Sequence, residues 1–441
     1  MTDERRPAGR EGQPPSLSLP AGREGQPPSS ERPANPADQP PTVGKKSIIR
    51  LYYFFQFSFT LLFWTPVFFE YQKRMGLSDP QIFHIQSIYY ILFCVLELPT
   101  GFFADRFGYR RSLIWGSVVL VVANLVAGYF TSFGGFVLHW ALIALARSFI
   151  SGASTAYLYE YLRRTNAHEE FKQIEGNARA YSLFGRVLCF AVIGYLMAWK
   201  ITLPYWLTAA SGGVALLIAF RLPVSPVGIR SNEKVAPKYN LSVAFRHALR
   251  SPWLLTLMFQ GIVIFVLARV ISVNLFQPIL GSKGFGIEAY GLVMAGMTLV
   301  EAFGSARPIW MRRWFSDVTS VFILSAIMAV TVALVPYFAN VGTLVLFGIF
   351  SLVTGLSYPI QKQVMNEAIP DPAYRATLLS CESLIDRAVM AGVAALLEHL
   401  THERDAFLLW VGVGSFFLVL AVQLVLHQLG KSRLTVGVTT S

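Results

Sequence analysis

Charged side chains are rare in the apolar stretches of this sequence, and those found there are the residues best placed to do chemistry. Glu97, Arg147 and Asp386 each lie inside a different apolar stretch. A charge near the centre of a lipid bilayer costs ~2.5–3.5 kcal/mol even on lenient insertion scales, so each one needs a reason. Desolvation favours the neutral form of a carboxyl group, which suits Glu97 and Asp386 to proton exchange. A guanidinium group in the same surroundings can hold an anionic group or a neighbouring carboxylate.

Glu97, Asp386 and Arg147 are therefore the candidate proton-coupling residues. Glu97 ranks first because it lies ~10 Å from the end of its predicted helix, at 1.5 Å per residue. Asp386 shares a helix face with Glu382 at i, i+4 spacing, and the two acids repel unless one is protonated or a cation from another helix intervenes. Arg147 or Arg186 would supply that cation. For each of these residues a purely structural ion pair is the alternative role.

A second group of charged residues lies in a short segment between two apolar stretches, Gly101-Phe-Phe-Ala-Asp105-Arg106-Phe-Gly108-Tyr109-Arg110-Arg111. Gly101 and Gly108 permit close helix approach and a tight turn. Asp105 would face the positive N-terminal end of another helix, and the start of the apolar stretch at residue 376 is the natural candidate. The basic residues can pair with nearby carboxylates. Membrane topology alone would explain the basic residues but not Asp105 or the two glycines.

This segment resembles the signature loop of the major facilitator superfamily, G-x-x-x-D-R-x-G-R-R/K, and departs from it at Tyr109, where the family usually has Arg or Lys. The resemblance covers about residues 48–428. It implies two pseudo-symmetric bundles of six transmembrane helices and transport by alternating access. The loop would act as a latch that holds the two bundles together in the outward-open state. Glu160 resembles the acid that completes a charge relay with Arg106 or Arg110 in this family.

The resemblance also implies a central cavity lined by the first, fourth, seventh and tenth spans. The polar residues on these spans are the candidate substrate contacts: Gln56, Arg147, Arg269, Asn274, Gln277, Tyr358 and Gln361. The ending P-E-S-P-R of sugar transporters is missing after the sixth span, so sugar uptake is not expected. An exporter of drugs or other small molecules is the subclass that we expect.

Composition restricts the elements that can position these residues. The chain has 441 residues, of which 54% are hydrophobic and only 14% are charged. A soluble domain carries about 25% charged residues. The shortfall excludes an ordinary cytosolic enzyme, a disordered scaffold and a nucleic-acid-binding module. Twelve spans of ~20 apolar residues would need ~240 apolar positions, which this chain can supply.

The apolar stretches predict an all-α membrane protein with twelve transmembrane helices. The first six spans are expected at about 48–69, 82–104, 112–131, 134–158, 180–199 and 201–220, and the second six at about 253–276, 287–304, 316–337, 340–361, 376–397 and 406–428. Each is long enough to cross ~30 Å of hydrocarbon. Helices are required because lipid offers no partner for unpaired backbone groups.

The polar segments complete the predicted domain organisation. Residues 1–46 are rich in proline and contain an exact duplication of PAGREGQPPS, which indicates a disordered tail. The two bundles are expected at 47–220 and 253–428, joined by a linker at 221–252 that contains a short amphipathic helix, with a second tail at 429–441. Lys and Arg, which give the net charge of +12, concentrate in the loops on one side. The positive-inside rule then places both termini in the cytoplasm of a multi-pass protein of the cytoplasmic (inner) membrane.

These patterns favour a secondary transporter that works as a monomer without a cofactor. Proton-coupled export of a small organic molecule is the first hypothesis, and uptake by symport or facilitated diffusion of a small metabolite is the second. A membrane receptor or an embedded enzyme is a remote alternative. The expected partners are the substrate, protons and the lipid bilayer, with no nucleic acid. No phosphate-binding loop or metal-ligand spacing occurs in the sequence.

Overall fold

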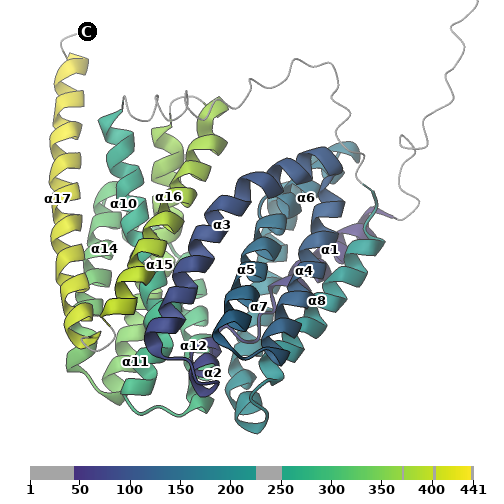
Figure 1. The fold of residues 1–441 in the computed structure, drawn as a ribbon. Coiled ribbons are helices and arrows are strands. Elements are labelled where there is room, and N and C mark those ends of the chain that lie inside the picture. Colours follow the sequence, from purple (N-terminus) through teal and green to yellow (C-terminus); the bar gives the residue numbers. More distant parts are fainter. Residues whose placement is uncertain (1–43, 225–250, 370–371, 401–403, 439–441) are drawn as a thin grey trace, which may run out of the picture. The chain divides into compact units, whose positions relative to one another are not determined.

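Helices account for every regular element in the part of the chain that the structure describes (Figure 1). The structure is a computed structural model, and it describes residues 44–224, 251–369, 372–400 and 404–438. These residues belong to one unit of the chain, Thr42–Ser441. Residues 1–43 of the tail predicted at 1–46 lie outside the described residues, as does the amphipathic helix expected within the 221–252 linker. Lys45 and Lys46, which were expected to belong to the tail, instead begin the first helix, Lys45–Thr60. We call the helices before residue 225 the N-half and those after residue 250 the C-half.

The N-half begins at Lys45 and ends at Arg221. Its elements are α1 (Lys45–Thr60), α2 (Phe68–Arg74), α3 (Asp79–Phe107), α4 (Tyr109–Tyr129), α5 (Phe133–Ile150), α6 (Ala153–Arg164), η2 (His168–Glu170), α7 (Phe171–Trp199) and α8 (Leu203–Arg221). Within this half, α4 packs against both α5 and α8, and α1 packs against α7 and α8.

The C-half begins at Pro252. Its elements are α10 (Pro252–Arg269), the π-helical segment η3 (Val270–Leu275), α11 (Phe276–Ser282), α12 (Ile287–Ser305), α13 (Ile309–Arg312), α14 (Asp317–Leu334), η4 (Val335–Tyr337), α15 (Asn340–Ala368), α16 (Pro372–His399) and α17 (Arg404–Val438). Within this half, α14 packs against α15 and α17. Helix α17 continues into residues 429–438, which were expected to form a tail.

Ten helical segments of the described residues are long and apolar enough to cross a membrane. The prediction of an all-helical, multi-span protein is therefore confirmed, and the number twelve stays a prediction. Two of the expected spans are not among the ten. The span expected at 48–69 is divided between α1 and α2, and the span expected at 376–397 carries three charged residues in the middle of α16.

The first span is interrupted because its sequence cannot continue a helix. Helix α1 ends at Thr60, whose hydroxyl donates to the carbonyl oxygen of Gln56 at 2.7 Å. Pro66 follows within the next turn and has no N–H to donate, so the chain passes through a turn before α2 starts. The fourth span, expected as a continuous helix at 134–158, is also divided. Gly152 has φ of +75° there, a left-handed conformation that glycine adopts without strain.

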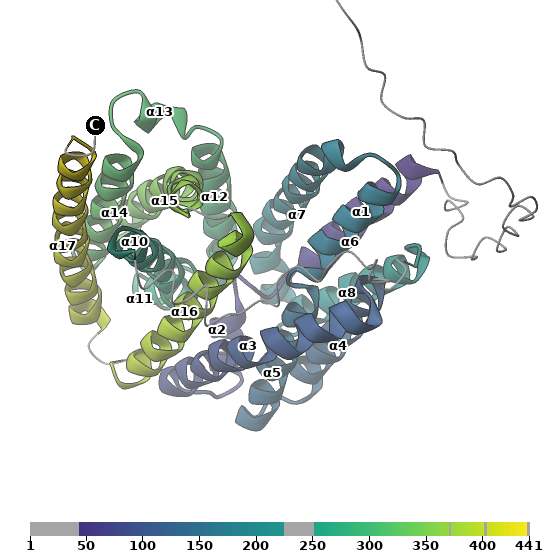
Figure 2. The ribbon, with the colours of Figure 1, turned by 90° about the horizontal axis from the view of Figure 1, so that it is seen from above.

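Two seams join the N-half to the C-half (Figure 2). In one, α3 packs against α16, and in the other α7 packs against α12. The second seam depends on glycine, because a Cβ at Gly291 would lie 2.1 Å from the carbonyl oxygen of Phe190. A Cβ at Gly194 would lie 2.6 Å from the carbonyl oxygen of Glu288. Small residues of this kind let two helix backbones approach closely.

Candidate functional site

A cavity of about 190 Å³ lies between the two halves. Its lining comes from both: Leu62, Trp64, Thr65, Phe68, Gln86, Tyr89, Tyr90, Phe93, Trp140 and Arg147 from the N-half, and Arg269, Val273 and Arg387 from the C-half. The cavity contains three arginines and six aromatic rings, and no Asp or Glu belongs to its described lining. Ligand sites occur preferentially at such boundaries between domains or bundles.

Helical spacing explains how the N-half builds its wall. In α3, Tyr89, Tyr90 and Phe93 follow Gln86 by three, four and seven residues, so all four face one side of that helix. Helix α5 places Trp140 and Arg147 seven residues apart, which is two turns on one face. The interruption of the first span turns Leu62, Trp64 and Thr65 toward the same space.

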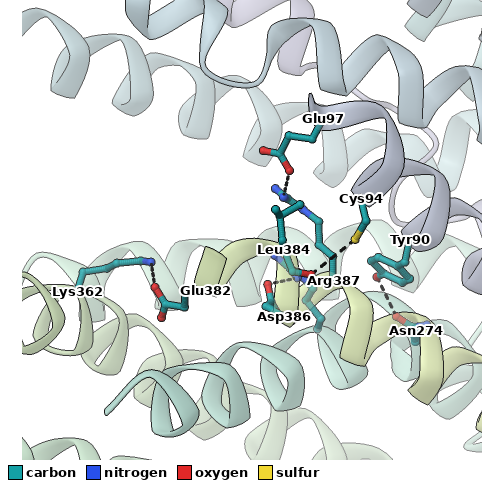
Figure 3. A network of polar contacts seen from close by, with 10 residues as sticks. Tyr90, Cys94, Glu97, Asn274, Lys362, Glu382, Leu384, Asp386 and Arg387 are labelled. Carbon is teal, nitrogen blue, oxygen red and sulfur yellow. Dashed lines mark hydrogen bonds and ion pairs between the residues drawn. The ribbon is translucent and has the colours of Figure 1, made fainter. Parts of the chain in front are cut away.

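Two of the three cavity arginines are bound to carboxylates (Figure 3). Arg269 of α10 is paired with Asp386 of α16, and this ion pair lies entirely within the C-half. Arg387 of α16 is paired with Glu97 of α3, so the second ion pair joins the two halves. Ser151 also donates to Glu97, at 3.3 Å between the hydroxyl and Oε1.

Arg147 differs from the other two arginines. No carboxylate of the described chain forms an ion pair with Arg147. Its Nη1 donates to the Tyr89 hydroxyl at 3.0 Å, and its guanidinium carbon lies 5.9 Å from the centroid of the Phe93 ring. The cavity wall therefore carries three cations, of which two are neutralised by Asp386 and Glu97.

The cations that separate Glu382 from Asp386 are not the expected ones. Both acids are buried, with 1% and 2% of their surface exposed. Lys362 of α15 binds Glu382, at 3.0 Å between Nζ and Oε2, and Arg269 binds Asp386. The expectation that Arg147 or Arg186 neutralises these acids was wrong, because Lys362 and Arg269 of the C-half do so.

The structure brings some of the predicted substrate contacts to the cavity and not others. Arg147 and Arg269 line it, and Asn274 lies beside it, where Oδ1 accepts a hydrogen bond of 3.3 Å from the Tyr90 hydroxyl. Gln277 lies elsewhere, between α11 and α2. Its Oε1 accepts from the backbone N–H of Phe69 at 2.8 Å, and its Nε2 donates to the carbonyl oxygen of Thr65 at 3.1 Å.

The other three predicted contacts do not line this cavity. Gln56 donates to the Tyr52 hydroxyl at 2.8 Å, within the N-half. Gln361 is buried in the C-half, where its Nε2 donates to the carbonyl oxygen of Leu257 at 2.9 Å. Tyr358 packs against Phe265, and the guanidinium carbon of Arg179 lies 5.8 Å from its ring centroid.

Sequence reasoning missed most of the aromatic lining, together with Gln86 and Arg387. The helical spacing of Gln86, Tyr89, Tyr90 and Phe93 was visible in the sequence. The same spacing is found on the buried face of an ordinary packed helix, so it did not indicate a cavity. Arg387 was visible as a charge in an apolar stretch. Its place in the cavity was not, because it depends on the rotation of α16 about its own axis.

The loop that resembles the family signature lies at one end of the helices, which we call the motif end. Gly108 has φ of +95° in the turn between α3 and α4 and therefore requires glycine. Arg110 donates to the carbonyl oxygens of Ala219 and Phe220, at 3.3 and 2.6 Å. Asp105 is hydrogen-bonded to Tyr109, the residue at which the loop departs from the family pattern.

The remaining residues of this loop are exposed at the motif end. Gly101, Arg106 and Arg111 are solvent-accessible in the unit described. Glu160 was expected to bind Arg106 or Arg110. Its ion-pair partners in the structure are instead Arg163 and Arg164, both at 3.1 Å on the same helix.

Contacts between the halves are found at the opposite end, which we call the far end. Besides Gln277, His84 of α3 lies 2.8 Å from Glu398 of α16. Ser87 donates to the carbonyl oxygen of Ala391 at 2.9 Å. Figure 1 shows α3 and α16 close together toward this end and diverging toward the motif end.

Comparisons with known proteins support the same architecture. Among curated protein sequences, none matches this chain significantly. A variant of the nucleoside transporter NupG matches with a TM-score of 0.72 at 14% identity, over 86% of this chain and 99% of that one. A peptide transporter POT in complex with sulfate matches with a TM-score of 0.68 at 14% identity, over 90% and 98% of the two chains. A D-xylose-proton symporter matches with a TM-score of 0.65 at 13% identity, over 86% and 96%.

These structural likenesses show the fold alone, because the identities are low. The family itself is shown by sequence, since the profile of the Major Facilitator Superfamily matches residues 48–380. The match includes the signature-like loop, most of both halves and all of the cavity arginines except Arg387. The protein is thus a transporter and not an enzyme, and the chain belongs to the major facilitator superfamily.

Proposed function

We propose that the protein is a secondary transporter that moves a small organic molecule across the cytoplasmic membrane by alternating access, with proton binding at Glu97 and Asp386 as the coupling step. The Glu97–Arg387 ion pair is the observation that carries the proposal. It joins the two halves at the wall of the cavity between them. Any movement that exposes the cavity first at one end and then at the other has to strain or break this pair.

Protonation offers a simple way to release the pair. A neutral carboxylic acid holds a guanidinium group far less strongly than a carboxylate does. A proton on Glu97 therefore loosens the link between the halves, and a proton on Asp386 frees Arg269 at the cavity wall. With the motif end in the cytoplasm, as the distribution of Lys and Arg predicts, the arrangement of contacts corresponds to an inward-facing state.

The same ion pairs bear on the direction of coupling. Each carboxylate occupies an arginine that a substrate would otherwise contact. Proton binding then makes the cavity more receptive to a substrate with hydrogen-bond acceptors, so proton and substrate favour each other's binding. Positive coupling between proton binding and substrate binding is what symport requires. The export that the sequence suggested requires proton and substrate to exclude each other, and it remains the alternative function.

Proton coupling is tested without knowledge of the substrate by measuring the distance between the halves. Spin labels at Arg111→Cys and Arg313→Cys, at the motif ends of the two halves, are placed on a chain in which the three native cysteines are replaced by serine. We expect the label distance distribution to change with pH. The double variant Glu97→Gln, Asp386→Asn should lose this dependence. Glu160→Gln, which removes a partly exposed carboxylate with local partners, is the matched control.

A pH response that survives in the double variant would contradict the assignment of these two carboxylates. Direction is settled separately in proteoliposomes with a pH gradient. Symport predicts that a transported solute accumulates on the side toward which protons flow, and export by exchange predicts accumulation on the opposite side.

A further inference from the structure

We propose that the cavity binds a small organic monoanion with a flat apolar body, such as an aromatic carboxylate. This proposal names the substrate class for the transport function proposed above and rests on it for its physiological meaning. The binding itself is a property of the cavity and follows from its charge, its hydrogen-bonding capacity and its shape.

The wall of the cavity carries an excess of positive charge. Arg147, Arg269 and Arg387 line the cavity, and only Asp386 and Glu97 neutralise them within the described chain. One positive charge remains, and it resides on Arg147. An unpaired charge in a membrane-embedded site is costly, so an anion that neutralises Arg147 relieves part of that cost when it binds. A single negative group is what restores neutrality.

Two of the three arginines lie near the same aromatic ring. Both lie near the Phe93 ring: the guanidinium carbon of Arg387 is 4.1 Å from its centroid, and that of Arg147 is 5.9 Å away. Arg147 belongs to the N-half and Arg387 to the C-half. A carboxylate between them would accept hydrogen bonds from both halves at once. Hydrogen bonds from a guanidinium group to a carboxylate are charge-assisted and therefore stronger than those between neutral groups.

Several buried polar atoms at the cavity have no hydrogen-bond partner in the described chain. Gln86 is 1% exposed and lines the cavity, and neither its Nε2 nor its Oε1 has a hydrogen-bond partner in the described chain. The indole N–H groups of Trp64 and Trp140 are also buried at the cavity without an acceptor. Buried polar groups are normally satisfied, so a cluster of unsatisfied ones indicates a ligand or ordered water. Three of these four atoms carry N–H groups, which can donate hydrogen bonds to an anion.

The cavity is small and its wall is largely aromatic. Six aromatic rings surround the charged groups, and such surfaces stack on flat apolar bodies. The cavity volume of about 190 Å³ is below the ~300–1,000 Å³ of sites for drug-sized ligands. A single-ring acid therefore fits the site better than a large amphipathic drug. The site is unsuited to organic cations, because its described lining contains three arginines and no Asp or Glu.

Binding measurements on the purified wild-type protein test the proposal directly. At pH 7.5, the probes are benzoate, its neutral analogue benzamide and its cationic analogue benzylammonium, with acetate as an anion that lacks the ring. We expect measurable binding of benzoate by calorimetry, about tenfold or more weaker binding of benzamide, and no binding of benzylammonium. Acetate should bind more weakly than benzoate because it lacks the apolar surface.

Equal binding of benzoate and benzamide, or preferred binding of the cation, would overturn the proposal. So would the absence of binding by benzoate and by its longer analogues phenylacetate and cinnamate. Because this comparison uses the unaltered protein, misfolding of a variant cannot account for the outcome.

Variants then locate the anion. Arg147→Gln should weaken benzoate binding by about 10- to 100-fold and leave benzamide binding nearly unchanged. Arg147→Lys keeps the charge and loses the planar fork, so it should recover part of the affinity. Arg186→Gln removes a partly buried arginine of α7 that does not line the cavity and is the matched control. A similar loss in Arg186→Gln would place the anion outside the cavity and contradict the proposal.

Failure of this proposal and failure of the transport function are distinguishable. If benzoate binds as described but no probe crosses the membrane of proteoliposomes, the binding proposal stands and the transport function fails. If a neutral or cationic probe is transported and no anion binds, the transport function stands and the anion proposal fails.

Discussion

The two seams between the halves are built from different chemistry. In the α3–α16 seam, side chains make the contacts: Ser87 bonds to Ala391 and Glu97 pairs with Arg387. In the α7–α12 seam, backbones touch because Gly194 and Gly291 have no side chains. The first seam borders the cavity and depends on charges that a proton or a ligand can change. The close backbone contacts of the second depend on shape. Charge-dependent contacts can be regulated by the transport cycle, whereas steric contacts supply a fixed surface along which the halves meet.

The largest effect is expected from adding one methyl group to the steric seam. In Gly291→Ala the new Cβ would lie 2.1 Å from the carbonyl oxygen of Phe190, so α7 and α12 must separate. Overpacking of this kind costs ~1–3 kcal/mol, and here the cost falls on the state in which the far end is closed. We expect the distance between labels at Arg111→Cys and Arg313→Cys to shift, with loss of most transport.

Gly296→Ala is the control for this substitution. Gly296 lies on the same helix, and nothing lies within 4 Å of the Cβ that it would gain. If both variants shift the label distance equally, the α7–α12 seam is not the constraint that its geometry indicates.

An intermediate effect is expected at the charged seam. Glu97→Arg places two cations together and should cost about 1–3 kcal/mol of the contact between α3 and α16, and Arg387→Glu should do the same with two acids. The double exchange restores an attractive pair in the opposite order. We expect it to recover at least half of the lost contact, measured by the same label distances. Recovery is not expected if the two residues act independently.

The smallest effect is expected from one neutral hydrogen bond in the same seam. Ser87→Ala removes the donor to Ala391 and should lower the free energy of unfolding by ~1 kcal/mol without altering the pH response of the label distance. Ser117→Ala, whose hydroxyl bonds within its own helix at 2.9 Å, is the control for thermal unfolding in detergent. A changed pH response in Ser87→Ala would show that the charged seam does not act through its ion pair alone.

Much of the architecture could be predicted from the sequence because hydrophobic length and helix geometry determine it. The loop from Gly101 to Arg111 identified the family, and the profile match over residues 48–380 confirms it. The interruptions after Thr60 and at Gly152 were missed, although Pro66 and Gly152 were visible. The mean hydropathy of a stretch of residues does not change at a helix interruption. Only the backbone conformation shows where the helical hydrogen bonds stop.

The site could be predicted only in part. Arg147 and Arg269 were found because a charge in an apolar span is conspicuous by itself. The pairing of Glu97 with Arg387 could not be found, since the residues are 290 positions apart and belong to different halves. Gln277 was assigned to the cavity because its span lines cavities in the family. It contacts α2 instead, because it lies past η3, at the far end of its span.

The π-helical segment η3 has a consequence for the motion of the C-half. It lies between Arg269, which is bound to Asp386, and Gln277, which holds the turn before α2. A π-helical turn contains one residue more than an α-helical turn, so the segment can pass to α-helix by a register shift of one residue. Such a shift rotates Gln277 by ~100° relative to Arg269 and advances it by ~1.5 Å along the axis. Release of the arginine would thereby be transmitted as torsion to the opposite end of the same span.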